Sequence, residues 1–157
     1  MWPIRIASKE DASACLAIRQ SIVDLCILDH ENDPAVLEHW LSNKTPENVE
    51  QWIDANPQGT FVADLDGYIA GIGLVRPHGY ILLNYVAPRV RFQGISKALM
   101  AAMEARSVAW GNDACTLKST ETAHAVYRML GYEDSGTPEP SFGRAVAYPM
   151  RRELVLP

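Results

Sequence analysis

Long apolar stretches, linkers and repeats are missing from this chain of 157 residues. No apolar run approaches the roughly 20 residues that a helix needs to cross a bilayer, and the N-terminus lacks the charged head and apolar stretch of an export signal. No Gly/Ser-rich or Pro-rich segment divides the chain. With 48% hydrophobic and 21% charged residues, the composition is typical of one globular domain with one core. We therefore expect residues 1–157 to form a single domain that has no membrane span.

Cysteines and metal-ligand patterns are also sparse. The three cysteines, Cys15, Cys26 and Cys115, are odd in number, far apart and without metal-type spacing. No two of the four histidines fall at a ligand spacing. These absences predict a cytoplasmic protein with small buried thiols and no bound metal. A nucleophilic role for Cys115 has no surrounding motif to support it.

Acidic residues are absent between Asp66 and Glu104, although the net charge of the chain is −5. Four basic residues lie inside that stretch, whereas the segment up to Asp66 has 12 acidic residues and 4 basic ones. The net charge, with the lack of a basic helix or an aromatic stacking platform, argues against a nucleic-acid-binding protein. The basic stretch would suit a polyphosphate, and the acidic segment would either attract a cationic substrate or simply be solvated. The acidic residues around the first two expected helices are Asp24, Asp29, Glu31, Asp33 and Glu38.

Caps and hydrophobic periodicity predict how the first half of the chain is organised. Residues 2–7 are expected to form a strand, and Ser8, with Asp11 three residues on, predicts the start of a helix. Asp33-Pro34 and Thr45-Pro46 each pair a cap with a proline, so two more helices are expected to begin there. We expect these three helices to form a lid over one end of a sheet. Strands are expected over 61–65 and 68–75, joined at Asp66-Gly67, and over 80–86.

The second half of the chain is expected to alternate helices and strands. A helix from Ile95 to Gly111, a strand over 114–119 and a helix from Thr120 to Gly131 are predicted. The last strand is expected over about 145–154, at an edge or a bulge, because Pro149 cannot donate a backbone hydrogen bond. Gly71-Ile72-Gly73 falls inside an expected strand, and Arg76 stands where a third glycine is needed, so a dinucleotide-binding motif is excluded. The order of elements predicts a mixed α/β fold.

The segment from Val86 to Lys97 has the pattern of a strand end, a tight basic turn and the start of a helix. The first turn of a helix has backbone N–H groups without intrahelical partners, and it lies at the positive end of the helix dipole. Gly94 has no Cβ, so an anion can approach the main chain, and Arg91 and Lys97 supply mobile positive charge. This pattern predicts a phosphate-binding turn.

Val86-x-Pro88 followed by Arg91-x-x-Gly94-x-Ser96 resembles the acetyl-CoA signature of the GNAT N-acetyltransferase superfamily, Gln/Arg-x-x-Gly-x-Gly/Ala. Ser96 departs from that signature, because it stands where the family usually has Gly or Ala. Residues 4–7 with Asp11 are similar to the family's first strand and helix start. Residues 120–132 resemble its late helix, Asn-x-x-Ala-x-x-x-Tyr-x-x-x-Gly-Phe, with Thr120 in place of Asn and Tyr132 in place of Phe. These three segments, in the family's order, extend over nearly the whole chain.

The resemblance implies a mixed, mostly antiparallel, twisted central sheet flanked by helices, in which the strands before and after the phosphate helix splay apart. It also implies an acetyl-CoA-dependent N-acetyltransferase, in which a primary amine of a small molecule or a peptide attacks directly in a ternary complex. In such an enzyme the backbone of Asn84, Tyr85 and Val86 would run beside the pantetheine arm, and Tyr127 would protonate the departing thiolate. The further residues expected to hold acetyl-CoA are Arg91, Phe92, Gln93, Gly94, Ile95, Ser96, Lys97 and Thr120.

The sequence does not identify the general base that accepts the proton of the amine. Many relatives use a Glu on the central strand or on the later one, whereas this chain offers Asn84 on the first and Cys115, Thr116 and Lys118 on the second. The alternatives are His124, which lies three residues before Tyr127, the run Asp29-His30-Glu31, and a water chain. The missing base also keeps a second function open, that of a non-catalytic acyl-CoA sensor or partner-binding module. Neither the amine acceptor nor an oligomeric state is indicated by the sequence.

Overall fold

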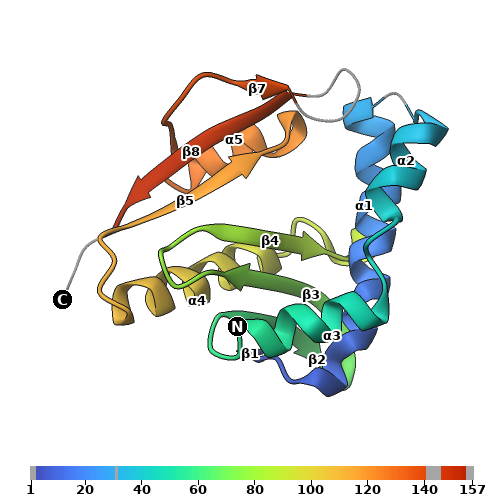
Figure 1. Cartoon of the computed structure of the whole chain (residues 1–157), viewed down its shortest axis with the longest axis horizontal. Helices are drawn as coiled ribbons and strands as arrows, with labels where there is room; N and C mark the ends of the chain where they lie inside the picture. The colour runs from blue at the N-terminus through green and yellow to red at the C-terminus, as the bar shows by residue number, and fades with distance from the viewer. Residues whose placement is uncertain (1–2, 31, 141–145, 155–157) are drawn as a thin grey trace.

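The computed structural model describes residues 3–30, 32–140 and 146–154, with the side chains of 26–30 outside that description (Figure 1). The first half holds β1 (Ile4–Ile6), the 3-10 helix η1 (Lys9–Ser13), α1 (Ala14–His30), α2 (Pro34–Leu41), α3 (Pro46–Ala55), β2 (Thr60–Leu65), β3 (Tyr68–Val75) and β4 (Ile81–Val86). The second half holds η2 (Pro88–Val90), α4 (Ile95–Ala109), β5 (Ala114–Ser119), α5 (Glu121–Met129), β6 (Glu133–Asp134), β7 (Glu139–Pro140) and β8 (Val146–Glu153). The predicted order of elements is confirmed, and the two-residue strands β6 and β7 are additions to it.

Two sheets meet between β4 and β5. The first is antiparallel in the order β1-β2-β3-β4, and the second has the order β5-β8-β6, with β7 also paired to β8. In the described part of the chain the sheets share one parallel bridge, between Tyr80 and Thr116, where the Thr116 N–H donates to the Gly79 carbonyl at 3.0 Å. Beyond that bridge β4 and β5 diverge, as Figure 1 shows. The predicted fold, mixed and mostly antiparallel with two splayed strands, is confirmed.

Side-chain caps fix where the helices begin. The Asp11 carboxylate accepts from the Ser8 N–H at 2.8 Å, which forms part of the capping box predicted there. Asp33 and Thr45 accept from backbone N–H groups two and three residues on, and a proline follows each cap. Thr120 caps α5 in the same way. Each cap satisfies a donor that the helix itself leaves unpaired, and all four predicted starts are confirmed.

Two glycine-containing features of the first sheet agree with what the sequence predicts. The β2–β3 hairpin turns at Asp66 and Gly67, whose φ angles are 53° and 91°, as a two-residue hairpin turn requires. Gly71 lies inside β3, and a Cβ added there would lie 3.2 Å from Leu99 of α4. Gly73 is similarly placed, at 2.8 Å from Met103. These two glycines therefore let α4 pack closely against the strand, in agreement with their exclusion from a nucleotide-binding motif.

The first sheet carries a hydrophobic core on each face. On one face the core includes Ile95, Leu99 and Met103 of α4. On the other face Ile18, Ile22, Val49 and Ile53 from α1 and α3 pack with Val62 and Ile72 of the sheet. The prediction that the three N-terminal helices form a lid over one end is therefore wrong for α1 and α3. Their apolar stripes bury more surface against a sheet face than an end offers.

Strand β8 lies in the middle of the second sheet, although Pro149 predicted an edge or a bulge. Pro149 is paired with Lys118 of β5, and its carbonyl accepts a hydrogen bond from the Ser135 N–H at 2.9 Å. Because the N–H and C=O of a strand residue point to the same side, the donor that proline lacks would also face Ser135. Strand β6 ends at Asp134, just before that point. The edge prediction is wrong because the neighbouring strand stops where the missing donor would be needed.

The outer surfaces of the helices expose a few apolar side chains. Leu16 and Val23 of α1 are 61% and 41% exposed, so the buried stripe of that helix is narrower than its apolar sequence. Among the described residues, no helix combines the length and apolar content that crossing a bilayer requires.

Candidate active site

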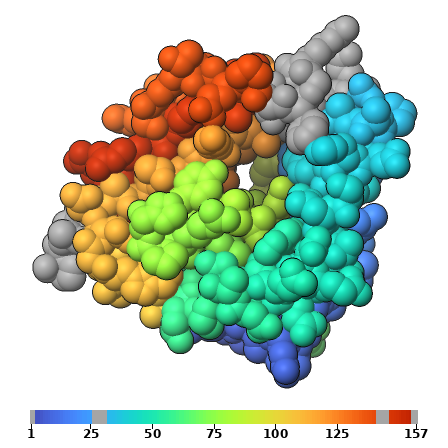
Figure 2. Space-filling model, viewed as in Figure 1, coloured from blue at the N-terminus to red at the C-terminus, as the bar shows by residue number. Residues whose placement is uncertain are grey.

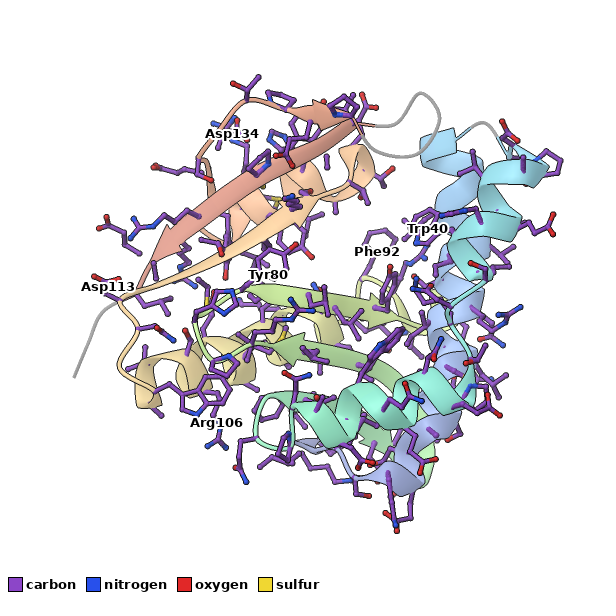
Figure 3. The ribbon with its side chains drawn as sticks, viewed as in Figure 1. Trp40, Tyr80, Phe92, Arg106, Asp113 and Asp134 are labelled. Carbon is purple, nitrogen blue, oxygen red and sulfur yellow. The ribbon has the colours of Figure 1, made fainter. Side chains whose placement is uncertain are left out.

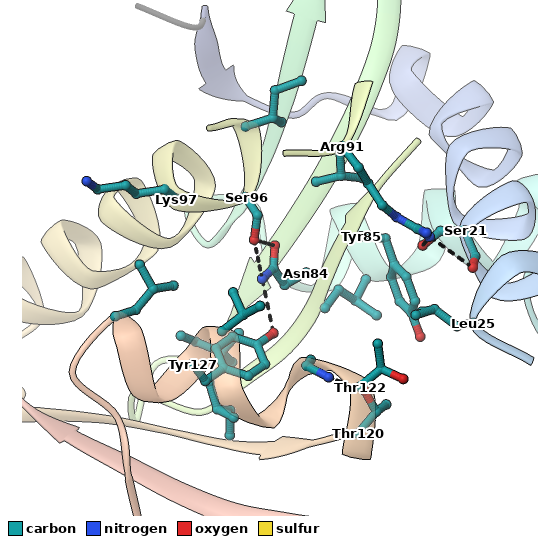
Figure 4. Close-up of a pocket in the computed structure, with 18 of the residues that line it drawn as sticks. Ser21, Leu25, Asn84, Tyr85, Arg91, Ser96, Lys97, Thr120, Thr122 and Tyr127 are labelled. Carbon is teal, nitrogen blue, oxygen red and sulfur yellow. Dashed lines mark hydrogen bonds between the residues drawn. The ribbon is translucent and has the colours of Figure 1, made fainter. Parts of the chain in front are cut away.

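A cavity of about 510 Å³ opens where β4 and β5 separate (Figure 2 and Figure 4). Its walls come from β4, β5, α5 and the start of α4, and from α1 and α2 on the other side. All the residues predicted to hold the acetyl donor line it except Gln93, and Tyr127 lines it too. The lining members of that set are Asn84, Tyr85, Val86, Arg91, Phe92, Gly94, Ile95, Ser96, Lys97 and Thr120. The fold therefore brings the predicted strand end, turn and late helix to one place.

The N-terminus of α4 presents its backbone at this cavity. Gly94 is the N-cap residue, with φ of 90°, and no side chain caps the helix. The Ala98 N–H donates to the Gly94 carbonyl at 3.0 Å, which leaves the preceding N–H groups of the first turn at the open helix end. Lys97 is exposed beside them. These backbone donors, the helix dipole and the lysine together form the arrangement that a phosphate-binding turn requires.

Arg91 is held in place by helix α1. Its Nη1 lies 3.1 Å from Asp24 Oδ2, and its Nη2 lies 3.2 Å from Ser21 Oγ (Figure 4). The expectation of a mobile positive charge at Arg91 is therefore wrong, because Asp24 neutralises this guanidinium and the serine fixes its position. The side chain still lines the cavity, where it connects the turn to the N-terminal helices.

Phe92 occupies a strained and open position in the same turn. Its φ is 62°, in the left-handed region that large side chains rarely adopt, and its side chain is 99% exposed. Backbone strain of this kind costs on the order of 1–3 kcal/mol and is concentrated at functional turns. Packing of the Phe92 side chain does not offset that cost, since the side chain is almost fully exposed at the rim of the cavity.

Tyr127 is joined to the start of α4 through Asn84. Asn84 Nδ2 donates to Tyr127 Oη at 3.0 Å and to Ser96 Oγ at 2.9 Å (Figure 4). Ser96 Oγ in turn lies 3.3 Å from Asn84 Oδ1. Burial raises the pKa of the Tyr127 hydroxyl above its usual value, and the hydrogen bond from Asn84 opposes part of that rise. The phenol is therefore protonated at neutral pH, and its side chain lines the cavity.

Two aromatic side chains form part of the opposite wall. Tyr85 of β4 and Trp40 of α2 both line the cavity, and a hydrogen bond joins their side chains. Burial raises the pKa of the Tyr85 hydroxyl, with the Trp40 contact acting in the other direction. Leu25 and Ser21 of α1 continue this wall. The sequence did not predict that Ser21, Leu25 and Trp40 line the cavity, because each occupies an ordinary position in an amphipathic helix.

The candidate bases do not gather in the cavity. The His124 ring packs on Tyr148 with centroids 4.5 Å apart, and its Nε2 lies 2.7 Å from Asp134 Oδ1. Asp134 lies at the outer edge of the second sheet, far from Trp40 in Figure 3. His124 is therefore directed to the second sheet and is not part of the cavity lining, to which α5 contributes Thr122, Ala123, Val126 and Tyr127. The side chains of Asp29, His30 and Glu31 lie outside the described residues.

The described part of the lining contains no carboxylate. Of the acidic residues expected near the first helices, Asp24 pairs with Arg91 and Asp33 caps α2. Among the described residues, no three His, Cys, Asp or Glu side chains lie together in a way that could hold a metal ion. The cavity is thus a mainly apolar space with a cationic helix end on one side and a phenol in its wall.

Comparison with known proteins gives one family. The acetyltransferase (GNAT) domain family matches residues 26–154 of the chain. No curated protein matches the sequence.

Solved structures resemble the whole chain. A GCN5-related N-acetyltransferase from Rhodopseudomonas palustris has 20% sequence identity and a TM-score of 0.84, with 98% of this chain and 96% of that chain covered. The PaiA N-acetyltransferase from Thermoplasma acidophilum, solved with coenzyme A, has 18% identity and a TM-score of 0.80, with 98% and 99% covered. A ribosomal-protein-alanine N-acetyltransferase from Brucella melitensis has 20% identity and a TM-score of 0.74, with 97% and 99% covered. At these identities the likeness shows a shared fold.

Proposed function

We propose that this chain, which belongs to the GNAT acetyltransferase family, is an acetyl-CoA-dependent N-acetyltransferase whose substrates meet in the cavity between β4 and β5. The acceptor is a primary amine of a small molecule or a peptide, which attacks the acetyl group directly in a ternary complex. The observation that carries the proposal is the position of Tyr127. Its hydroxyl lies in the cavity, held by Asn84, which also binds Ser96 at the start of α4.

The residues around the cavity fit the parts of acetyl-CoA. The N-terminus of α4 with Lys97 suits the pyrophosphate. Strand β4 is at the edge of its sheet, so beyond the bridge at Tyr80 its backbone can pair with the amides of the pantetheine arm. Leu117 and Leu130 provide apolar surface for the arm. Coenzyme A in the PaiA structure supports the same donor here.

Bound acetyl-CoA supplies the acetyl group as a thioester. As the amine nitrogen bonds to the acetyl carbon, the carbon–sulfur bond breaks and the sulfur leaves with its electron pair. Tyr127 gives its hydroxyl proton to that sulfur and recovers a proton from solvent, while the proton lost by the amine passes to water. A phenol is a weaker acid than a thiol with a pKa near 8.5, so this transfer depends on the positioning of the hydroxyl.

Direct attack agrees with the placement of the thiols. Cys15 and Cys115 are buried, and burial raises the pKa of each thiol, so both are protonated and inert. Neither lines the cavity. Of the cysteines whose side chains the structure describes, neither is available as a nucleophile for an acetylated intermediate. Buried free thiols also support the cytoplasm as the place of action.

The acceptor side of the cavity favours an amine with an apolar body. Leu25, Trp40 and Tyr85 supply apolar and aromatic surface there, and the described lining has no carboxylate to pair with a second cationic group. Glu38, exposed on α2, acts at longer range by attracting the ammonium form of the amine from solution. The acceptor we propose is therefore a monoamine or peptide amine with an apolar side.

A non-catalytic acyl-CoA sensor is the alternative, and the absence of a carboxylate from the described lining favours it. Thiol release from acetyl-CoA across a panel of primary amines, measured beside coenzyme A binding, separates the two functions. Amine-dependent thiol release is expected. Coenzyme A binding without turnover on any amine would indicate the sensor, and failure to bind coenzyme A would overturn both.

A further inference from the structure

The side chain of Asn84 connects three elements that are far apart in the sequence. It lies on β4 and contacts Ser96 of α4, 12 residues away, and Tyr127 of α5, 43 residues away. All three side chains line the cavity, and Figure 4 shows Asn84 between the other two. A partly buried amide is unfavourable unless it is hydrogen-bonded, and here its partners come from both walls of the donor site.

The hydrogen bonds of the Asn84 amide constrain the direction of the Tyr127 hydroxyl hydrogen. An Asn amide has two N–H hydrogens, and Asn84 directs one to Tyr127 Oη and the other to Ser96 Oγ. Tyr127 Oη is thus the acceptor in its contact with Asn84, and its own hydrogen must point elsewhere. Within the described residues that hydrogen has no acceptor, so it faces the cavity.

We propose that Asn84 positions the Tyr127 hydroxyl for proton transfer and that Ser96 holds the Asn84 amide in place. This inference rests on the proposed function. When Tyr127 gives its proton to the departing sulfur, negative charge develops on Oη, and the N–H of Asn84 already points at that oxygen. A hydrogen bond to a charged oxygen is stronger than one to a neutral hydroxyl, so Asn84 stabilises the transition state more than the ground state. The same pairing accounts for Ser96 in a position where the family has Gly or Ala: its hydroxyl fixes Asn84.

The test uses Asn84→Leu, which keeps the approximate volume of the side chain and removes both donors. We expect kcat to fall about 10- to 100-fold, because a hydrogen bond to a charged group is lost, while coenzyme A affinity stays within about threefold. Ser96→Ala should lower kcat by less, because Asn84 keeps its contact with Tyr127. Asn48→Ala is the matched control, since the Asn48 amide on α3 is exposed and donates only to a backbone carbonyl among the described residues.

A double variant shows whether Asn84 acts through Tyr127. If it does, Asn84→Leu/Tyr127→Phe should have the same kcat as Tyr127→Phe alone. Near-normal turnover of Asn84→Leu, or losses that multiply in the double variant, would overturn the positioning role and leave the proposed function intact. Should the wild-type protein lack turnover with every amine, the proposed function fails, and an ultraviolet titration still tests the contact. Loss of Asn84 should then raise the pKa of Tyr127, and an unchanged pKa would overturn the contact itself.

Discussion

Arg91 and Asp24 join the turn before α4 to helix α1 at the wall of the cavity. Their side chains are 3.1 Å apart and are 22% and 46% exposed. A partly exposed ion pair of this kind contributes at most about 1 kcal/mol to stability. Its larger effect is electrostatic, because it places a carboxylate close to the helix end where phosphates are proposed to bind.

Asp24→Asn should therefore strengthen coenzyme A binding. Removing this negative charge leaves Arg91 uncompensated beside the phosphates, and we expect the dissociation constant to fall about two- to fivefold at low salt. Titration calorimetry at two salt concentrations measures the effect, which should shrink at high salt. Asp113→Asn is the control, because Asp113 is 80% exposed and pairs with Arg151 of β8, outside the cavity lining. Weaker binding by Asp24→Asn would mean that the ion pair shapes the turn instead.

Gly94→Glu should abolish binding of coenzyme A. It places a side chain and a negative charge at the N-cap of α4, where the phosphates must approach the backbone. For the wild-type protein, coenzyme A at about 100 times its dissociation constant should raise the free energy of unfolding by about 2.7 kcal/mol. Thermal melts with and without coenzyme A measure this gain, which the variant should lose.

A matched control separates strain from ligand binding in that experiment. Gly111 has φ of 91°, close to the 90° of Gly94, and a Cβ there would enter open space. Gly111→Glu therefore carries a similar backbone strain and the same charge outside the cavity lining. It should lower the melting temperature of the free protein but keep the full shift with coenzyme A. Loss of the shift in both variants would show that strain, rather than a blocked anion site, was measured.

Trp40→Ala should raise the KM for the amine about tenfold or more and leave coenzyme A affinity unchanged. Trp40 lies on the α2 side of the cavity and supports Tyr85 through a hydrogen bond, so its loss removes aromatic surface from the acceptor side. Steady-state kinetics with an arylalkylamine and with a polyamine provide the measurement. The arylalkylamine should be the better acceptor for the wild-type protein. A preference for the polyamine would contradict the apolar acceptor site.

The pH dependence of kcat/KM should show no alkaline decline below about pH 10. Burial raises the pKa of Tyr127 above its usual value, and an acid catalyst acts in its protonated form, so its activity is lost only above that pKa. The rate should instead rise between about pH 6 and 9, because a larger fraction of the amine is neutral. A bell-shaped profile with a decline near pH 8 would assign the proton donor to a more acidic group.

Local signals explain why so much of the fold could be predicted. Thr45, Thr120 and Asp66-Gly67 each act within three residues of themselves, by capping a helix or closing a hairpin, so the sequence alone determines them. The edge position predicted from Pro149 was wrong, because the effect of a proline in a strand depends on where the neighbouring strand ends, and that is a tertiary property.

The same distinction applies to the site. The turn and Tyr127 belong to patterns that are continuous in sequence, and they were predicted. The Asn84 contacts and the Arg91–Asp24 pair join residues 12 to 67 positions apart, so no local pattern contains them. One feature of the sequence did point to the Asn84 contacts: Ser96 departs from the family signature, and its hydroxyl accepts a hydrogen bond from Asn84. His124 was placed near Tyr127 by helical spacing, but packing of α5 decided which of its faces meets the cavity.

Tyr127→Phe tests the one side chain assigned to the chemistry. The change removes the hydroxyl and keeps the ring, whose edge packs on Tyr132 with centroids 5.9 Å apart, so the fold should survive. Because the proton donor acts on the departing sulfur, kcat should fall roughly 100-fold or more while coenzyme A affinity stays nearly unchanged. Turnover is measured beside coenzyme A affinity and melting temperature, with Tyr148→Phe as the control, since Tyr148 packs on His124 and is not part of the cavity lining. A tyrosine with a merely structural role would lower the melting temperature and leave the turnover of folded protein intact. Near-normal turnover of Tyr127→Phe would show that the sulfur takes its proton from solvent.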